Sequence, residues 1–214
     1  MSKNLFDLHG RTALITGGNG GIGLGIAKGF AESGANIAIA GRNTTKTEEV
    51  VANFRERNTS AIGIEVDVAD QESVQDMIGN TLEAFGRIDI LVNNAGIGIR
   101  NLPHEYPLED WNKVIDINLT GAFLCSKAVY PNMKTRGSGK IINIGSGKPR
   151  KIRNIIEHVK RISKGGYPQF GKIKLRKDEI LKLYPNIKKA EKKINWRPKI
   201  SFEKGLRRTI NSFK

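Results

Sequence analysis

The chain has 214 residues, a formal net charge of +15 and a hydrophobic content of 38%, which is ordinary for a globular protein. It contains no apolar run of about 18 residues and no apolar segment near its first residue, so we expect neither a transmembrane helix nor a secretory leader. The single cysteine, Cys125, excludes an intrachain disulfide and favours a cytoplasmic protein.

The charge is concentrated in the last third of the chain. Residues 147–214 carry 22 of the 36 Lys and Arg residues but only 5 of the 21 Asp and Glu residues. The preceding segment is mildly acidic, so the change falls near Ser146. Such asymmetry indicates either an anionic partner or two segments of different origin.

A glycine-rich turn, Thr16–Gly23, lies between an apolar run and a helical pattern. The run Thr12–Ile15 predicts a buried strand, and Gly25–Glu32 predicts a helix. That helix has its large apolar residues on one face: Ile22, Ile26 and Phe30. Glycines let a backbone approach a pyrophosphate closely, and a helix N-terminus offers unpaired N–H groups. The order strand, turn, helix therefore favours a phosphate-binding cradle over the alternative, a glycine-rich surface loop.

Strand and helix patterns then alternate along the chain. Four further apolar runs predict strands: Asn36–Ala40, Ala61–Val68, Ile88–Val92 and Lys140–Ile144. Helical spacing lies between them, and one long helix is expected over about Trp111–Lys134, with Asn118 near its middle. This alternation predicts an α/β fold with a parallel sheet covered on both faces. Right-handed crossovers give a Rossmann-like, doubly wound sheet with strand order 3-2-1-4-5.

Several motifs at the predicted strand ends occur in the order found in one enzyme family. They are Thr16-Gly17 with Gly21 and Gly23, Asp67-Val68, Asn93-Asn94-Ala95-Gly96, Asn118, and Ile144-Gly145-Ser146. On these motifs, residues 1–146 resemble the short-chain dehydrogenase/reductase family. The resemblance implies an NAD(P)-binding Rossmann domain and hydride transfer between a nicotinamide and a carbonyl or alcohol.

The resemblance also assigns the cofactor-binding residues. They are Gly17, Asn19, Gly21, Ile22, Gly23, Arg42, Asp67, Val68, Asn94, Ala95 and Gly96. At the end of the second strand, where an acidic side chain would accept from a ribose 2′-OH, the chain has Gly41 followed by Arg42. An arginine there can pair with a 2′-phosphate, which favours NADP over NAD. The alternative is that Arg42 is a solvated surface residue.

The catalytic set is incomplete in this sequence. Ser146 matches the family's substrate-binding serine, and Asn118 matches the asparagine that supports a water relay. The family places a Tyr-x-x-x-Lys pair about a dozen residues after this serine, and the corresponding segment here, Ile155–Arg161, contains no tyrosine. The same spacing occurs at Tyr130 with Lys134 and at Tyr184 with Lys188, which we interpret as coincidence because proton transfer depends on geometry before pKa. His158, on a charged helical pattern, is interpreted as a solvated residue.

The basic segment 147–214 resembles the C-terminal end of extended-type sugar-nucleotide epimerases and dehydratases. The matching residues are Gly145–Pro149, Leu175-Arg176 with Glu179, Trp196 with Pro198, and Gly205-Leu206 with Thr209-Ile210. The resemblance implies that Arg176 contacts a nucleotide diphosphate. We therefore expect two domains, 1–146 and 147–214, joined as a chimera.

Three functions follow as alternatives. The first is an NADP-binding oxidoreductase for a small alcohol, ketone or sugar, with impaired turnover. The second is an epimerase-like enzyme or binder of sugar nucleotides. The third is a basic protein that binds nucleic acid, for which no specific motif is present. We expect no metal site and no membrane association, and a homo-oligomer is compatible with the first two functions.

Overall fold

The computed structural model describes residues 7–99, 101, 105–143, 157, 161, 201, 203 and 204. The chain divides into two units, residues 1–101 with 106–144 and residues 102–105 with 145–214, and each is described by itself. Almost all of the described residues belong to the first unit. Among the described residues, no helix is both long and apolar enough to cross a membrane.

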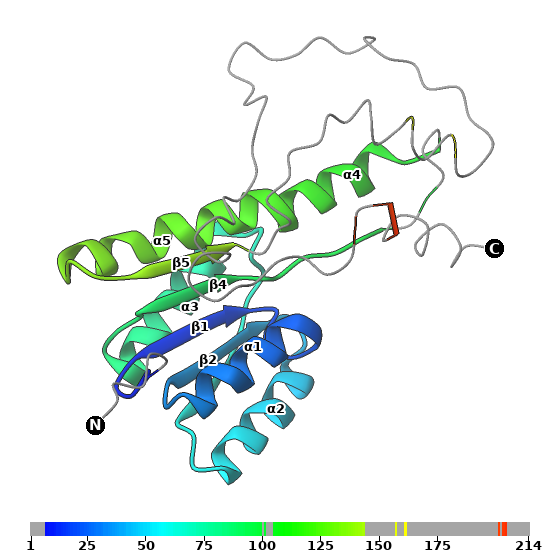
Figure 1. Ribbon diagram of the computed structural model, residues 1–214. Helices are drawn as coiled ribbons and strands as arrows, with labels where there is room; N and C mark the ends of the chain where they lie inside the picture. Colours follow the sequence, from blue (N-terminus) through cyan, green and yellow to red (C-terminus); the bar gives the residue numbers. More distant parts are fainter. Residues whose placement is uncertain are drawn as a thin grey trace. The chain divides into compact units, whose positions relative to one another are not determined.

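The first unit contains a sheet of five parallel strands (Figure 1). The strands are β1 (Thr12–Thr16), β2 (Asn36–Gly41), β3 (Ala61–Glu65), β4 (Ile90–Asn93) and β5 (Lys140–Asn143). Their order across the sheet is β3-β2-β1-β4-β5. The predicted doubly wound α/β fold and its strand order are therefore confirmed.

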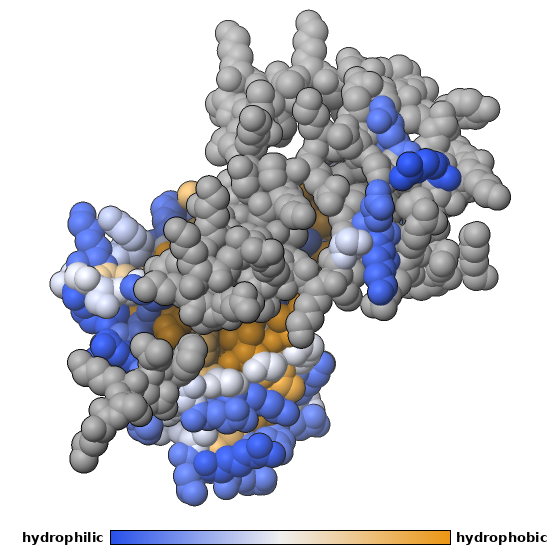
Figure 2. All heavy atoms as spheres, viewed as in Figure 1, coloured by the Kyte–Doolittle hydropathy of each residue, from blue (hydrophilic) through white to orange (hydrophobic). Residues whose placement is uncertain are grey.

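Helices cover both faces of the sheet because successive residues of each strand point to opposite faces. On one face, Ala13, Ile15, Ile37 and Ile39 pack with residues of α1 (Gly21–Glu32) and α2 (Thr44–Glu56). On the other face, Leu14, Ala38 and Leu91 pack with residues of α3 (Gln71–Phe85) and α5 (Gly121–Thr135). Burial on both faces explains why the strands have continuous apolar runs instead of alternating patterns. Figure 2 shows the apolar side chains of this unit between hydrophilic side chains on its outer surface.

The third strand is shorter than predicted. β3 ends at Glu65, so Val66, Asp67 and Val68 lie beyond it instead of within it. The partner strand β2 ends at Gly41, whose carbonyl oxygen accepts only a long hydrogen bond of 3.4 Å from Val66 N–H. Beyond Glu65, β3 has no residue of β2 to pair with. Val66, Asp67 and Val68 instead line a pocket at this edge of the sheet.

The predicted long helix is interrupted by a wider turn. It consists of α4 (Leu108–Ile115), a π-helical turn η1 (Asp116–Thr120) and α5, which follow one another without a loop. Gly121 begins α5 against Val68: a Cβ at Gly121 would lie 2.7 Å from Val68 Cγ2 and 3.0 Å from its carbonyl oxygen. The helix therefore approaches the end of β3 more closely than any residue but glycine allows.

The first helix differs from its predicted apolar face. The residues of α1 that are fully buried are Gly23 and Ala27, whereas Ile26 and Phe30 are only partly buried. Ile22 is 67% exposed. The start of α1 therefore packs against the glycine-rich turn through the backbone of Gly23 and not through a large apolar side chain.

A charged cluster lies at the amino end of the sheet, opposite the glycine-rich turn. Asp89, only 7% exposed as a side chain, accepts hydrogen bonds from the guanidinium groups of Arg11 (3.1 Å), Arg87 (2.6 and 2.7 Å) and Arg136 (3.1 Å). Oδ2 of Asp89, which accepts from Arg87 Nε, also accepts from Thr12 N–H at 3.0 Å. Burial raises the pKa of Asp89, but the donors of Arg87, Thr12, Arg136 and Arg11 together outweigh burial and hold this pKa well below its usual range.

Little of the second unit is described. Glu203 and Lys204 are helical, and the Ser201 hydroxyl oxygen accepts a hydrogen bond from Lys204 N–H at 3.2 Å. This geometry is that of a helix N-terminus and agrees with the helix start expected near Ser201. Arg161 and Glu203 form an exposed ion pair with a separation of 3.9 Å.

Candidate functional site

The glycine-rich turn connects β1 to α1 through two glycines that no other residue replaces without strain. Gly17 has φ of 63°, in the left-handed region that favours glycine. A Cβ at Gly23 would lie 2.5 Å from the carbonyl oxygen of Gly17 and would also press on the Asn94 side chain. The N-cap of α1 is Gly20, which has no side chain to occupy the first N–H groups, and the first turn contains no acidic residue. The helix N-terminus is therefore free to receive an anion.

Hydrogen bonds fasten this turn to the end of β4. Thr16 Oγ1 accepts from the backbone N–H groups of Asn94 and Ala95, both at 3.1 Å, and donates to the Val92 carbonyl at 3.2 Å. In return, Asn94 Nδ2 donates to the carbonyl oxygens of Thr16 and Gly17, both at 3.0 Å. The two loops are thus held as one unit at the carboxyl edge of the sheet.

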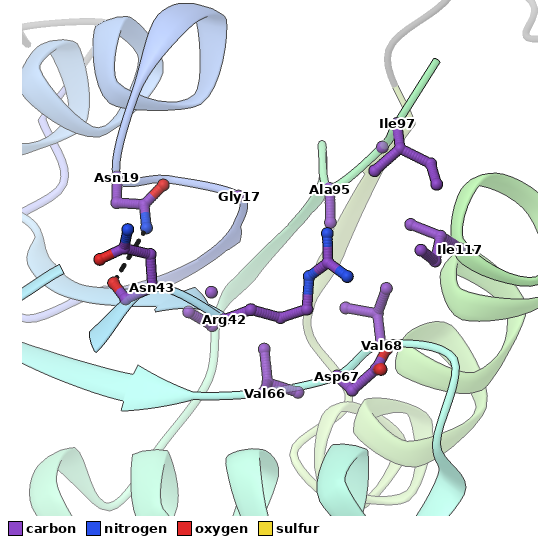
Figure 3. Close-up of a pocket in the computed structure, with 13 residues that line it drawn as sticks. Gly17, Asn19, Arg42, Asn43, Val66, Asp67, Val68, Ala95, Ile97 and Ile117 are labelled. Carbon is purple, nitrogen blue, oxygen red and sulfur yellow. Dashed lines mark hydrogen bonds between the residues drawn. The ribbon is translucent and has the colours of Figure 1, made fainter. Parts of the chain in front are cut away.

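A pocket of about 230 Å³ opens at this edge (Figure 3). Its lining comes from the ends of β1, β2 and β4, from the residues after β3 and from η1. The lining residues are Gly17, Asn19, Ala40, Gly41, Arg42, Asn43, Val66, Asp67, Val68, Ala95, Gly96, Ile97 and Ile117. The location fits the rule that open α/β sheets bind ligands at the carboxyl ends of their strands, where the order of strands reverses.

The wall formed by the end of β2 is ordered by Asn19. Its Nδ2 donates to Thr47 Oγ1 at 3.0 Å and lies 3.4 Å from the Asn43 carbonyl oxygen, the contact drawn in Figure 3. Asn43 is the N-cap of α2, and its Oδ1 accepts from Lys46 N–H at 2.9 Å. The glycine-rich turn and the start of α2 are therefore linked directly.

Arg42 and Asp67 come from neighbouring strands and both line the pocket. In Figure 3 the Arg42 side chain extends across the pocket toward Ala95 and Val68. Arg42 forms no ion pair with another described residue. Asp67 Oδ1 accepts from Ala69 N–H at 3.0 Å, which stabilises the turn before α3. The guanidinium group of Arg42 is thus available to an anionic ligand.

Asn118 lies in the π-helical turn and holds the loop after β4. Its Oδ1 accepts from Ile97 N–H at 2.8 Å, and its Nδ2 donates to the Ile97 carbonyl at 2.9 Å. Gly96 lies against the same amide, because a Cβ there would be 3.2 Å from Asn118 Oδ1. Turns of this kind interrupt α-helices mostly at functional positions, and here the turn presents Asn118 to the pocket wall.

Asn93 links three elements next to this wall. Its Nδ2 donates to Ser126 Oγ at 3.0 Å, to the Ala122 carbonyl at 3.3 Å and to Asn143 Oδ1 at 2.9 Å. The side chain at the end of β4 therefore holds α5 and the end of β5 in place. Asn93 does not line the pocket; it fixes the positions of the elements around it.

The structure brings together most of the residues predicted to bind the cofactor. Those that line the pocket are Gly17, Asn19, Arg42, Asp67, Val68, Ala95 and Gly96. The other predicted cofactor-binding residues lie just outside the lining, in the first turn of α1 and in the hydrogen bonds beneath the pocket: Gly21, Ile22, Gly23 and Asn94. Asn118, predicted as a catalytic residue, also lies just outside the lining. Ser146 and Arg176 lie outside the described residues, as do His158, Tyr184 and Lys188.

Sequence reasoning did not assign several lining residues. Asn43 stands directly before the helical pattern of α2, and asparagine is a preferred N-cap residue. This preference could have placed Asn43 at the start of α2, next to the pocket. Ile97 and Ile117 adjoin the Asn-Asn-Ala-Gly motif and Asn118, but apolar residues beside a motif are equally typical of a core. Nothing in the sequence separates these two uses.

Three other residues named in the sequence analysis lie on α5. Lys134 Nζ lies 6.0 Å from the centre of the Tyr130 ring, and this ring is exposed. Cys125 is buried against the opposite side of the helix, and burial raises the pKa of its thiol to about 12. The thiol is therefore protonated at neutral pH and packs as a small apolar group.

Comparison with protein families gives one match. Residues 11–164 match the family described as short chain dehydrogenase. The match begins just before β1 and continues past Ser146, into the segment that was expected to resemble epimerases. No comparison shows that second resemblance.

Many curated relatives and solved structures are similar to this chain, and three of them illustrate the likeness. The 3-oxoacyl-[acyl-carrier-protein] reductase of Synechocystis sp. is 43% identical, over 65% of this chain and 57% of its own length. Glucose 1-dehydrogenase 2 of Bacillus subtilis is 38% identical, over 65% of this chain and 55% of its own length. A short-chain type dehydrogenase/reductase from Mycobacterium marinum has a TM-score of 0.64 with 37% identity, covering 66% of this chain and 58% of that one. The chain thus spans somewhat more than half the length of the relatives it matches.

Proposed function

The chain belongs to the short chain dehydrogenase family, and from this membership we propose that its first unit binds a nicotinamide dinucleotide as part of an oxidoreductase. The observation that carries the proposal is the pocket at the carboxyl edge of the sheet. It combines an open helix N-terminus, two glycines without room for a side chain, and an arginine without an acidic partner among the described residues. The helix N-terminus and the two glycines suit the pyrophosphate of any dinucleotide, and the arginine suits a further phosphate.

The residues present fit such a cofactor. The first turn of α1 would receive the pyrophosphate on its N–H groups, because Gly17 and Gly23 leave the backbone uncovered. Asp67 and Val68 would flank the adenine, while Ala95 and Gly96 would border the ribose and the nicotinamide. When bound, the nicotinamide supplies hydride transfer with a carbonyl or alcohol carbon. The chain's own part is to orient the ring and to exclude water around it.

We propose NADP as the preferred cofactor, with NAD as the alternative. Gly41 offers no carboxylate to a ribose 2′-OH, and Arg42 follows it in the pocket lining. Arginine pairs with phosphate through two parallel hydrogen bonds, which lysine and neutral residues cannot reproduce.

We expect Arg42→Gln to weaken NADPH binding about tenfold, which corresponds to roughly 1.4 kcal/mol, and to leave NADH binding within a factor of two. The reason is that only NADPH carries the charged group that Arg42 would meet. Fluorescence titration of the reduced cofactors measures both constants. The matched control is Arg57→Gln at the C-terminus of α2, which is also exposed and lies outside the pocket lining.

We further propose that turnover is impaired. Asn118 is described beside the pocket wall, whereas Ser146 is the only other matching catalytic residue and no Tyr-x-x-x-Lys pair lies about a dozen residues after it, where the family places one. Loss of a general acid/base typically reduces a rate by about 10²–10⁴. Substrate class is set by the remaining part of such enzymes, and small alcohols, ketones and sugars are the proposed range.

We expect the chain to bind NADPH but to reduce substrates only at a background rate. NADPH at about 100 times its dissociation constant should stabilise the folded chain by about 2.7 kcal/mol, while reduction of small ketones and sugars stays near background. Thermal unfolding with and without cofactor measures the first, and NADPH absorbance the second. Absence of any shift at millimolar NADPH and NADH would contradict the proposed function, and robust ketone reduction would contradict the proposed impairment.

A sugar-nucleotide function is a second proposal, and it depends on residues 147–214 alone. It requires that Arg176 contact a nucleotide diphosphate, as in the epimerases that this segment resembles. Calorimetric titration with UDP-sugars, with Arg176→Ala as comparison, tests it independently of NADPH binding. A chimeric origin of the chain is part of the same proposal.

A further inference from the structure

We infer that Lys46, a residue of α2 with no role so far, is the second cation that holds the 2′-phosphate of NADP. The inference rests on the proposed function and names a further residue that determines the specificity of the same site. The observation that supports it concerns the surroundings of Gly20. Gly20, the N-cap of α1, has no side chain, and the space beside it is occupied.

The amine of Lys46 occupies this space. A Cβ at Gly20 would lie 2.8 Å from Lys46 Nζ and 3.4 Å from Lys46 Cε. The side chain of Lys46 is exposed, and its end lies beside the glycine-rich turn. Any larger residue at position 20 would displace this amine.

The start of α2 is held so that Lys46 reaches the turn. Asn43 Oδ1 accepts from Lys46 N–H at 2.9 Å, and Thr47 Oγ1 donates to the Asn43 carbonyl at 2.8 Å. Asn19 Nδ2 donates to the same Thr47 hydroxyl at 3.0 Å. Asn19 and Asn43 line the pocket, whereas Lys46 lies outside the lining. Its amine is beside Gly20, the residue after Asn19, and we call this position the rim.

The two cations near this rim form no ion pair with another described residue. Asp67 also lines the pocket, but no ion pair joins it to Arg42 or to Lys46. The first turns of α1 and α2 contain no acidic residue, so both helix N-termini add positive potential. The amine of Lys46 therefore lies next to a helix N-terminus, where an anion is favourable and a cation is not.

The ligand that suits this arrangement is a dianion. A phosphate monoester carries about −1.5 to −2 charges near pH 7, so a single guanidinium neutralises only part of it. Arg42 from the end of β2 and Lys46 from α2 supply two positive charges from two elements. An adenosine ribose with a free 2′-OH would gain little from the second cation, and discrimination between NADP and NAD would therefore depend on both.

The test uses Lys46→Met, which keeps the length of the side chain and removes its charge. We expect the dissociation constant for NADPH to rise about tenfold and that for NADH to change by less than twofold. The same selective loss is expected for 2′,5′-ADP against 5′-AMP, two ligands that differ in the 2′-phosphate. Lys46→Arg should retain most of the NADPH affinity. The matched control is Lys28→Met, an exposed lysine of α1 outside the pocket lining.

The outcomes separate the two proposals. If the unaltered chain binds NADPH and Lys46→Met binds it equally well, the role of Lys46 is overturned while the proposed function stands. Equal losses of NADPH and NADH affinity in Lys46→Met would also overturn it, because they indicate damage to the whole turn. If the unaltered chain binds neither cofactor, the proposed function fails and the inference fails with it.

Discussion

Asp89→Asn is expected to lower the free energy of unfolding at pH 7 by roughly 3 kcal/mol. The change leaves the Arg11, Arg87 and Arg136 guanidinium groups together without the carboxylate that they share. It also weakens the bond from Thr12 N–H, which helps to align the first residue of β1 beside the start of β4. Urea unfolding followed by far-ultraviolet circular dichroism measures the difference.

The loss of unfolding free energy in Asp89→Asn should be larger at neutral pH than at acidic pH. The native pKa of Asp89 is depressed, so the stabilisation by its carboxylate is fully present above the unfolded pKa of about 3.9 and is lost as the pH falls below it. The difference between Asp89→Asn and the unaltered chain should therefore shrink between pH 7 and pH 3. Asp76→Asn, an exposed carboxylate on α3, serves as control and should change stability by less than about 0.5 kcal/mol. A difference that is the same at both pH values would contradict the assigned cause.

Gly23→Ala is expected to weaken NADPH binding at least tenfold and to destabilise the first unit by about 1–3 kcal/mol. The new methyl group would meet the Gly17 carbonyl oxygen at 2.5 Å and press on the Asn94 amide. Either α1 moves away from the turn or Asn94 releases its bonds to the Thr16 and Gly17 carbonyls. Both movements alter the N–H groups that would receive the pyrophosphate.

The control for this second substitution lies on the same helix. Gly29→Ala places a methyl group where nothing lies within 4 Å, so it should stabilise α1 by about 0.5–1 kcal/mol and leave NADPH binding unchanged. Thermal unfolding and fluorescence titration of both variants give the comparison. If Gly23→Ala binds NADPH as tightly as Gly29→Ala, the close approach at Gly23 has no bearing on the pocket.

The fold was predictable because its strands are buried on both faces. Runs such as Asn36–Ala40 are apolar without alternation, and the helical patterns between them leave only parallel connections. The ends of elements were harder to predict, because they depend on a partner elsewhere. β3 stops at Glu65 since β2 stops at Gly41, and no local signal in Val66, Asp67 and Val68 reveals this.

The site was predictable in so far as its residues stand at strand ends. Asn19, Arg42 and Asp67 are far apart in sequence yet line one pocket, as parallel strands require. The position of Lys46 could not be read from the sequence, because it depends on where the end of a long side chain lies relative to Gly20. The exposure of Ile22 also depends on a tertiary contact. Gly23, and not Ile22, is the residue of α1 that packs against the glycine-rich turn.

The π-helical turn at Asp116–Thr120 has a consequence for how this protein tolerates change in length. Such a turn accommodates one more residue than a regular helix, and each residue of a helix advances the screw by about 100°. Deleting one residue there would leave a regular α-helix, because the wide turn already absorbs the extra residue. Cys125, Val129 and Met133 of α5 would therefore keep facing the interior. Asn118 lies within the wide turn, so its position would change and its two hydrogen bonds to Ile97 would be lost. The extra residue thus serves the pocket wall and is not needed for the packing of α5.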